Sequence, residues 1–96
     1  MITIVVPFTT SISAGTEIDL SPYFTGEIRR IAKAILFTGS DATSPASATE
    51  LTVVTGTPSS GQIQLVSSTS IKLGDAVDTK NILVLVVELW GEYVKA

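Results

Sequence analysis

The chain has 96 residues, of which 45% are apolar and only 16% are charged, and its formal net charge at pH 7 is −3. This length predicts a single domain over residues 1–96 with one limited core. The acidic balance argues against a nucleic-acid partner, because proteins that bind nucleic acids neutralise phosphates with a basic patch. The sequence contains neither His nor Cys, which excludes disulfides, thiolate nucleophiles and imidazole bases and leaves no soft metal site.

The first predicted elements are short strands that end at prolines. The segment ITIVVPF, residues 2–8, is rich in β-branched residues, and Pro7 cannot donate to a sheet and so suits a strand end or an edge. It starts without a basic region and is soon interrupted by this proline, so we expect no signal peptide. The segment TEIDLSPYF, residues 16–24, alternates apolar and acidic side chains, which predicts a half-buried strand that breaks before Pro22.

The segment EIRRIAKAILFTG, residues 27–39, fits two structures. Some of its apolar residues recur at the spacing of an amphipathic helix, namely Ile28, Ile31, Ala32, Ile35 and Leu36. Its surroundings favour a strand instead, since the neighbouring segments all have strand patterns and AILFTG is typical of a strand that leads into a turn. We therefore expect a strand over 27–38, with a short helix as the alternative.

The second half of the chain continues the pattern of strands and turns. The polar, Pro-containing stretch 40–50 predicts a long exposed loop. Further strands are expected at 51–56, 62–68, 70–75 and 82–90, with hairpin-like turns between them. About seven or eight strands in one domain predict an all-β fold, an antiparallel β-sandwich of jelly-roll-like type.

The last predicted strand, ILVLVVELW, is apolar at every position except Glu88, so both of its faces are hydrophobic. It is much shorter than the roughly 18 apolar residues that span a bilayer, so we expect no membrane segment. We predict that one face lies in the core and that the other contacts a neighbouring subunit. The predicted oligomer interface consists of Leu83, Leu85, Val87, Glu88, Leu89 and Trp90.

Some arrangements of polar residues could carry chemistry. The stretch GTPSSG, residues 56–61, has the glycine spacing of a phosphate-binding loop, but Gln62 stands where that motif needs Lys, so a turn is favoured. Asp75, Asp78 and Asn81 could hold calcium, but they lack the spacing of an EF-hand and fit a solvated turn better. Paired carboxylates on an exposed strand face give little support for acid–base catalysis in a chain without His. We therefore predict no enzymatic activity, no catalytic residue, no cofactor and no metal site.

Two further features bear on possible partners. Glu88 is expected either to mark the solvent-facing side of its strand or to pair with Arg29, Arg30 or Lys33. Aromatic residues near the predicted strand ends could form a platform for sugar stacking, but packing in the core or in an interface is favoured. These aromatic residues are Tyr23, Phe24, Trp90 and Tyr93.

The segment 51–88 resembles a sequence pattern of small phage and prokaryotic-virus virion proteins. In that pattern, a strand ending in Gly-x-Pro-x-x-Gly is followed by an alternating strand, a Leu-Gly-Asp-Ala turn and an apolar last strand. The matching residues are Gly56, Pro58, Gly61, Ile63, Leu65, Leu73, Gly74, Asp75 and Ala76. The segment 18–28 is also similar to the early part of such chains. The resemblance implies a jelly-roll β-sandwich that assembles as a homo-oligomer in or on a capsid or tail, and it carries over no functional residue.

Together, these features predict a structural, self-associating virion protein that acts by burying apolar surface between subunits. We expect it to be made in the host cytoplasm and to serve as a capsid, decoration or tail component. A trimer or another ring is the favoured state, with other virion proteins as further partners and neither nucleic acid nor membrane among them. The alternative is a small binding module for carbohydrate or protein that uses loop 40–50 or the C-terminal aromatic residues.

Overall fold

A computed structural model describes residues 1–39 and 45–90 of the chain. These described residues form eight strands, which are β1 (Ile2–Pro7), β2 (Glu17–Asp19), β3 (Ile28–Gly39), β4 (Pro45–Glu50), β5 (Thr52–Val54), β6 (Gln62–Ser67), β7 (Ser70–Leu73) and β8 (Asn81–Leu89). The ambiguous segment 27–38 is therefore a strand, as we expected from its surroundings. The described residues contain no helix that is long and apolar enough to cross a membrane.

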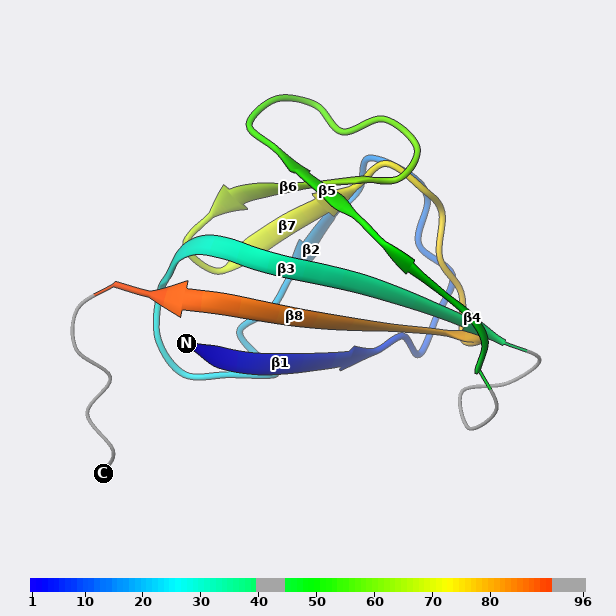
Figure 1. Ribbon diagram of the computed structural model, residues 1–96, viewed down its shortest axis with the longest axis horizontal. Coiled ribbons are helices and arrows are strands. Elements are labelled where there is room, and N and C mark those ends of the chain that lie inside the picture. Colours follow the sequence, from blue (N-terminus) through cyan, green and yellow to red (C-terminus); the bar gives the residue numbers. More distant parts are fainter. Residues whose placement is uncertain (40–44, 91–96) are drawn as a thin grey trace.

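The strands form two sheets that pack against each other as a β-sandwich (Figure 1). The first sheet has the strand order β1-β8-β3-β4, and the second has the order β2-β7-β6-β5. This arrangement confirms the predicted all-β sandwich. The pairs β1–β8 and β2–β7 are antiparallel and nested, the last strand with the first and the last but one with the second, as in the outer part of a jelly roll.

The pairing of β5 with β6 differs from the predicted hairpin, because these two strands run parallel. The backbone nitrogen of Thr52, at the start of β5, donates to the carbonyl oxygen of Gly61 at 2.9 Å. Gly61, the residue before β6, therefore lies beside the first residue of β5, so the chain has run back along the full length of β5. The stretch 55–61 makes this full return, and the turn at Ser59–Gln62 is only its last part. A reading of local turn residues misses this, because a Gly-Pro turn signal says nothing about the chain that precedes the turn.

Half of the predicted loop 40–50 is a strand. Residues 45–50 form β4, which pairs antiparallel with β3 from Ile35↔Glu50 to Gly39↔Pro45, while residues 40–44 lie outside the described part of the chain. The small polar side chains of PASATE have little β propensity, but sheet hydrogen bonds are made by the backbone and the edge of β3 needs partners. At Leu51 the chain leaves the first sheet and enters the second.

The strand β2 ends at Asp19, two residues before the break expected at Ser21-Pro22, because a turn follows it directly. The carboxylate of Asp19 accepts hydrogen bonds from the backbone nitrogen of Ser21 at 3.0 Å and from its Oγ at 2.9 Å. The backbone nitrogen of Tyr23 then donates to the carbonyl oxygen of Leu20 at 2.9 Å. An Asp that binds its own backbone two residues on is a local signal that competes with strand extension.

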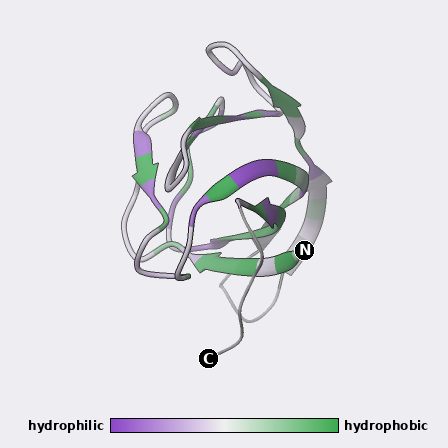
Figure 2. Ribbon diagram, turned by 90° about the vertical axis from the view of Figure 1, so that its left-hand side faces the viewer, coloured by the Kyte–Doolittle hydropathy of each residue, from purple (hydrophilic) through white to green (hydrophobic). Residues whose placement is uncertain are grey.

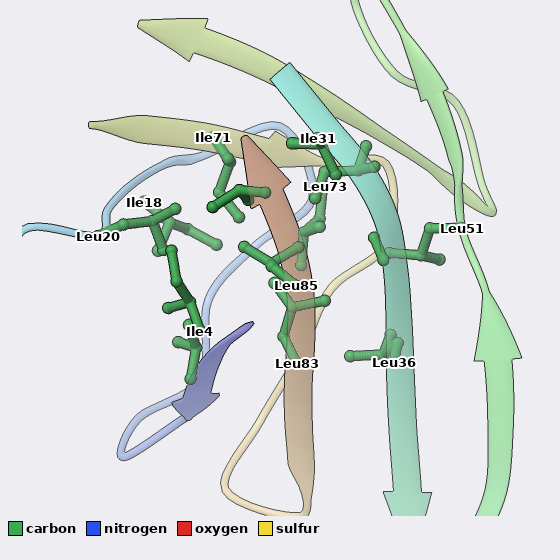
Figure 3. Packing of buried hydrophobic residues seen from close by; sticks show 14 of the residues in the cluster. Ile4, Ile18, Leu20, Ile31, Leu36, Leu51, Ile71, Leu73, Leu83 and Leu85 are labelled. Carbon is green, nitrogen blue, oxygen red and sulfur yellow. The ribbon is translucent and has the colours of Figure 1, made fainter. Parts of the chain in front are cut away.

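One hydrophobic core lies between the two sheets, and its side chains come from both of them (Figure 3). The most deeply buried large side chains are Ile4, Val6, Leu20, Ile28, Ile63, Ile71, Leu83, Leu85 and Val87. Figure 2 shows the corresponding distribution along the ribbon, with apolar residues on the strands and more polar residues in many of the connections. One face of each central strand therefore packs in the core, and the opposite face points away from it.

Asn81 is a buried polar residue at the start of β8, and it joins two elements. Its side-chain nitrogen donates to the carbonyl oxygen of Phe37 at 3.3 Å and to the Oγ1 of Thr38 at 2.9 Å. Its Oδ1 accepts from the backbone nitrogen of Asp78 at 2.9 Å. Because these bonds satisfy both ends of the amide, Asn81 is a structural residue rather than a ligand for calcium.

Candidate interaction surface

The strand β8 presents alternate residues to the core and to the outside. Leu83, Leu85 and Val87 are 0% exposed and lie in the core. A neighbouring subunit cannot reach them, so the prediction that Leu83, Leu85 and Val87 belong to an oligomer interface is wrong. In a strand that is apolar at almost every position, a shift of one residue exchanges the two faces, and the sequence alone does not show which set points inward.

The outer face of the first sheet is also apolar along β8. Ile82, Val84 and Val86 are half-buried there, and the register places Val84 between Val5 of β1 and Ile35 of β3. Val5 is 52% exposed. Residues paired across a sheet share a face, so the next row holds the outer residues at 7, 82 and 37. We define the outer patch as Val5, Pro7, Ile35, Phe37, Ile82, Val84 and Val86.

This composition is unusual for the solvent side of a sandwich, where antiparallel strands normally alternate apolar and polar residues. The outer patch covers three neighbouring strands and about three rows of side chains. With strands ~4.8 Å apart and a rise of ~3.4 Å per residue, it occupies about 300 Å² of sheet. A contiguous apolar patch of that size on a small protein is typical of an interaction site.

One end of the same sheet is charged. The Oε1 of Glu88 lies 2.9 Å from Nη1 of Arg29, and its Oε2 lies 3.3 Å from Nη2 of Arg30. Of the two roles expected for Glu88, the structure shows the ion pair, with 30% of the side chain still exposed. Two guanidinium groups share one carboxylate, so this end of the sheet carries an excess of positive charge.

Leu89, Trp90 and Phe24 lie near that charged end or against the core, and Tyr23 is 40% exposed. Leu89 and Phe24 are partly buried and pack against the core. Trp90 is 59% exposed, and the guanidinium carbon of Arg29 lies 5.3 Å from the centre of its ring, within the range of a cation–π contact. Tyr93 lies outside the described residues. Trp90 therefore borders the charged end and is not part of the core.

The acidic residues considered as calcium ligands hold turns together. Asp75 accepts hydrogen bonds from the Oγ of Ser60 at 2.6 Å and from the backbone nitrogen of Gly61 at 2.7 Å. These bonds lower the pKa of the Asp75 carboxyl. Asp78 accepts from the backbone nitrogen of Lys80 at 2.8 Å within its own turn. Within residues 1–39 and 45–90, no group of three or more His, Cys, Asp or Glu side chains could hold a metal ion.

The variant Asp75→Asn is expected to lower the free energy of unfolding by about 1–2 kcal/mol near neutral pH. The Asn side chain has one acceptor oxygen instead of two and carries no charge, so it cannot replace both hydrogen bonds to the ionised carboxylate. The folded protein lowers the pKa of Asp75 from its ordinary value of 3.8. The stabilisation is therefore present above that value and is lost as the pH falls through the lower, folded pKa. Urea unfolding of both proteins should show the difference narrowing from about pH 5 to about pH 2. A constant difference across this range would contradict the assignment.

The surface thus combines the outer patch, which is apolar, with a charged end formed by Arg29, Arg30 and Glu88 and bordered by Trp90. Neither part contains a nucleophile beside a base, and both present side chains that bind other molecules by contact. A comparison of the chain with models of protein families, with curated proteins and with solved structures found no match.

Proposed function

We propose that the protein is a structural subunit that self-associates through the outer patch, as a capsid, decoration or tail component of a virion. The observation that carries the proposal is the apolar outer face of β8, the strand between β1 and β3, with Val5 beside it at 52% exposure. Water contact with such a face is unfavourable, and covering it favours association. The resemblance of residues 51–88 to small virion proteins supports the setting.

A second copy of the chain suits this surface because the charges at its rim complement each other. Glu50 pairs in register with Ile35, and Lys33 pairs in register with Val86 one row away. A twofold axis that crosses the strands between these two rows would bring each Lys33 near the partner's Glu50. A twofold contact makes this pairing twice, once in each direction.

The size of the patch sets the strength of one such contact. Two copies would bury about 600 Å² in total, which is half of the ~1,200 Å² at the lower limit of stable interfaces. At ~25 cal/mol per Å², burying this area favours association by roughly 15 kcal/mol. The loss of translational and rotational freedom opposes association by about 4–15 kcal/mol. A single contact is therefore weak. Many weak contacts in one shell or ring reinforce each other, as an assembled particle requires.

The variant Val5→Glu is expected to abolish self-association, because it places a charge that would need desolvation at the centre of the contact. Sedimentation velocity from about 10 µM to about 1 mM should show the wild-type mass rising above the 10.1 kDa of one chain, while Val5→Glu stays at that mass.

The matched control is Val53→Glu, which changes a valine of similar exposure, 41%, on β5 of the other sheet. This variant should associate like the wild type. A wild-type mass of 10.1 kDa at every concentration, or equal association of Val5→Glu and wild type, would refute the proposal.

A further inference from the structure

The first sheet has an open strand position beside β3. The strand β4 pairs with β3 only from Ile35 to Gly39, and the chain then departs at Leu51, whose backbone nitrogen donates to the carbonyl oxygen of Ala34 at 2.8 Å. Figure 1 shows β5 leading away from β3 beyond this point. Among the described residues, none pairs with the backbone of 29–33 on the side away from β8. We call this stretch the free edge.

A groove of about 260 Å³ lies between the free edge and β5. It is lined by Arg29, Arg30, Ile31, Val53, Val54, Thr55 and Leu65. The groove is smaller than the roughly 300–1,000 Å³ of typical small-molecule sites. Two irregularities in the pairing of β3 with β8 set residues 29–33 opposite only Val86–Glu88, so the free edge is about 10 Å long, enough for a short extended segment that places one side chain between the sheets.

The charges at the free edge select the kind of peptide. Arg29, Arg30 and Lys33 are three of the six basic residues in a chain with net charge −3. The two arginine side chains are 56% and 54% exposed, and Glu88 is the carboxylate that they share. Two copies of the chain that met along this edge would bring like charges together, which is one way in which proteins prevent edge strands from pairing with themselves. The basic side chains of the free edge instead attract an acidic segment, because its charges are of opposite sign.

We propose that the free edge binds an extended acidic segment of a partner protein, which adds to the first sheet as a further strand. Successive side chains of that segment point to opposite faces of the sheet. An apolar side chain enters the groove beside Ile31 and Val54, and acidic side chains lie on the outer face near Arg30 and Lys33. The free edge shares only Lys33 with the proposed self-association, so the two interactions are tested separately on a protein in which the outer patch cannot associate.

The probe is the blocked hexapeptide SEVEVS, titrated into nitrogen-15-labelled Val5→Glu protein, in which the outer patch cannot associate. We expect saturable changes of the amide NMR shifts at residues 29–33 and 52–55. The peptide SKVKVS, of opposite charge, should bind at least about tenfold more weakly. The peptide SEVPVS should bind at least about tenfold more weakly than SEVAVS, which carries the same single glutamate, because proline removes a backbone donor that a strand needs, whereas binding by charge alone would not distinguish the two peptides.

Protein variants give an independent test. Arg30→Glu should weaken binding of SEVEVS about tenfold, and Lys80→Glu, which reverses an exposed cation in the β7–β8 turn, should change it less than about twofold. No saturable change with SEVEVS up to about 10 mM would overturn the proposal. Equal binding of SEVPVS and SEVAVS, or shift changes centred on Val84 and Val86, would also overturn it. These peptide results are read on one folded protein and do not depend on how well Arg30→Glu folds.

Discussion

Replacing Gly74 by alanine is expected to lower the free energy of unfolding by about 2–4 kcal/mol. The added methyl group would overlap the carbonyl group of Ser59, a backbone segment that cannot rotate away as a side chain could. The backbone nitrogen of Gly74 also donates to the carbonyl oxygen of Gln62 at 3.0 Å, so Gly74 cannot retreat without breaking that bond. The loss therefore reflects a close approach of two chain segments.

The matched control is Gly56→Ala, in the β5–β6 connection that contains Ser59. A methyl group there would meet nothing within 4 Å, so the expected change is within about 0.5 kcal/mol. Urea unfolding followed by circular dichroism measures both variants. Equal stability of Gly74→Ala and wild type would show that the 55–61 connection yields easily, contrary to the tight contact described here.

Truncating Leu85 to alanine is expected to cost about 3–5 kcal/mol, because its fully buried side chain leaves a cavity between the sheets. Its neighbour Val84 points to the outer face, and Val84→Thr, which keeps the branched shape, should cost about 1 kcal/mol or less. The same urea measurement compares the two. A larger loss in Val84→Thr than in Leu85→Ala would mean that the inward and outward sets of β8 have been exchanged.

The same pair of variants separates stability from association. Leu85→Ala should leave the surface of the folded protein unchanged, whereas Val84→Thr adds a hydroxyl to the outer patch. Sedimentation of the folded fraction should therefore show weaker self-association for Val84→Thr than for Leu85→Ala.

The strand nature of residues 28–39 could be predicted from the surroundings but not from the segment's own periodicity, and the structure explains why. Two irregularities in the pairing of β3 with β8 each place an extra residue in β3, the first between Ile28 and Arg30 and the second between Ile31 and Lys33. Each extra residue shifts the inward position by one. Ile28, Ile31 and Ala34 are consequently all buried at a spacing of three, which imitates one face of a helix.

The strand β4 and the parallel pair β5–β6 could not be predicted for a different reason. The residues 45–50 contain no large apolar side chain and only one β-branched residue, Thr49, and they pair because the neighbouring edge of β3 offers backbone partners. The parallel pairing follows from a return of the chain over 55–61, a non-local arrangement with no short sequence signature.

The candidate site was predicted in part. The two-faced character of β8 and the pairing options of Glu88 followed from a single charge in an apolar run. The orientation of the strand was not predicted, although the two sets of residues differ in type. The residues that point inward include Leu83 and Leu85, whereas those that point outward, Ile82, Val84 and Val86, are all β-branched. The free edge had no signal at all, because it exists only where β4 leaves β3.

The position of β8 has a consequence for how the protein is made. This strand comes last among the eight, yet it lies in the first sheet between β1 and β3 and supplies hydrogen-bonding partners to both. The chain emerges from the ribosome with its N-terminus first. β1 and β3 therefore cannot pair with β8, the main neighbour of both, until residues 81–89 have emerged. Closing such long loops is slow.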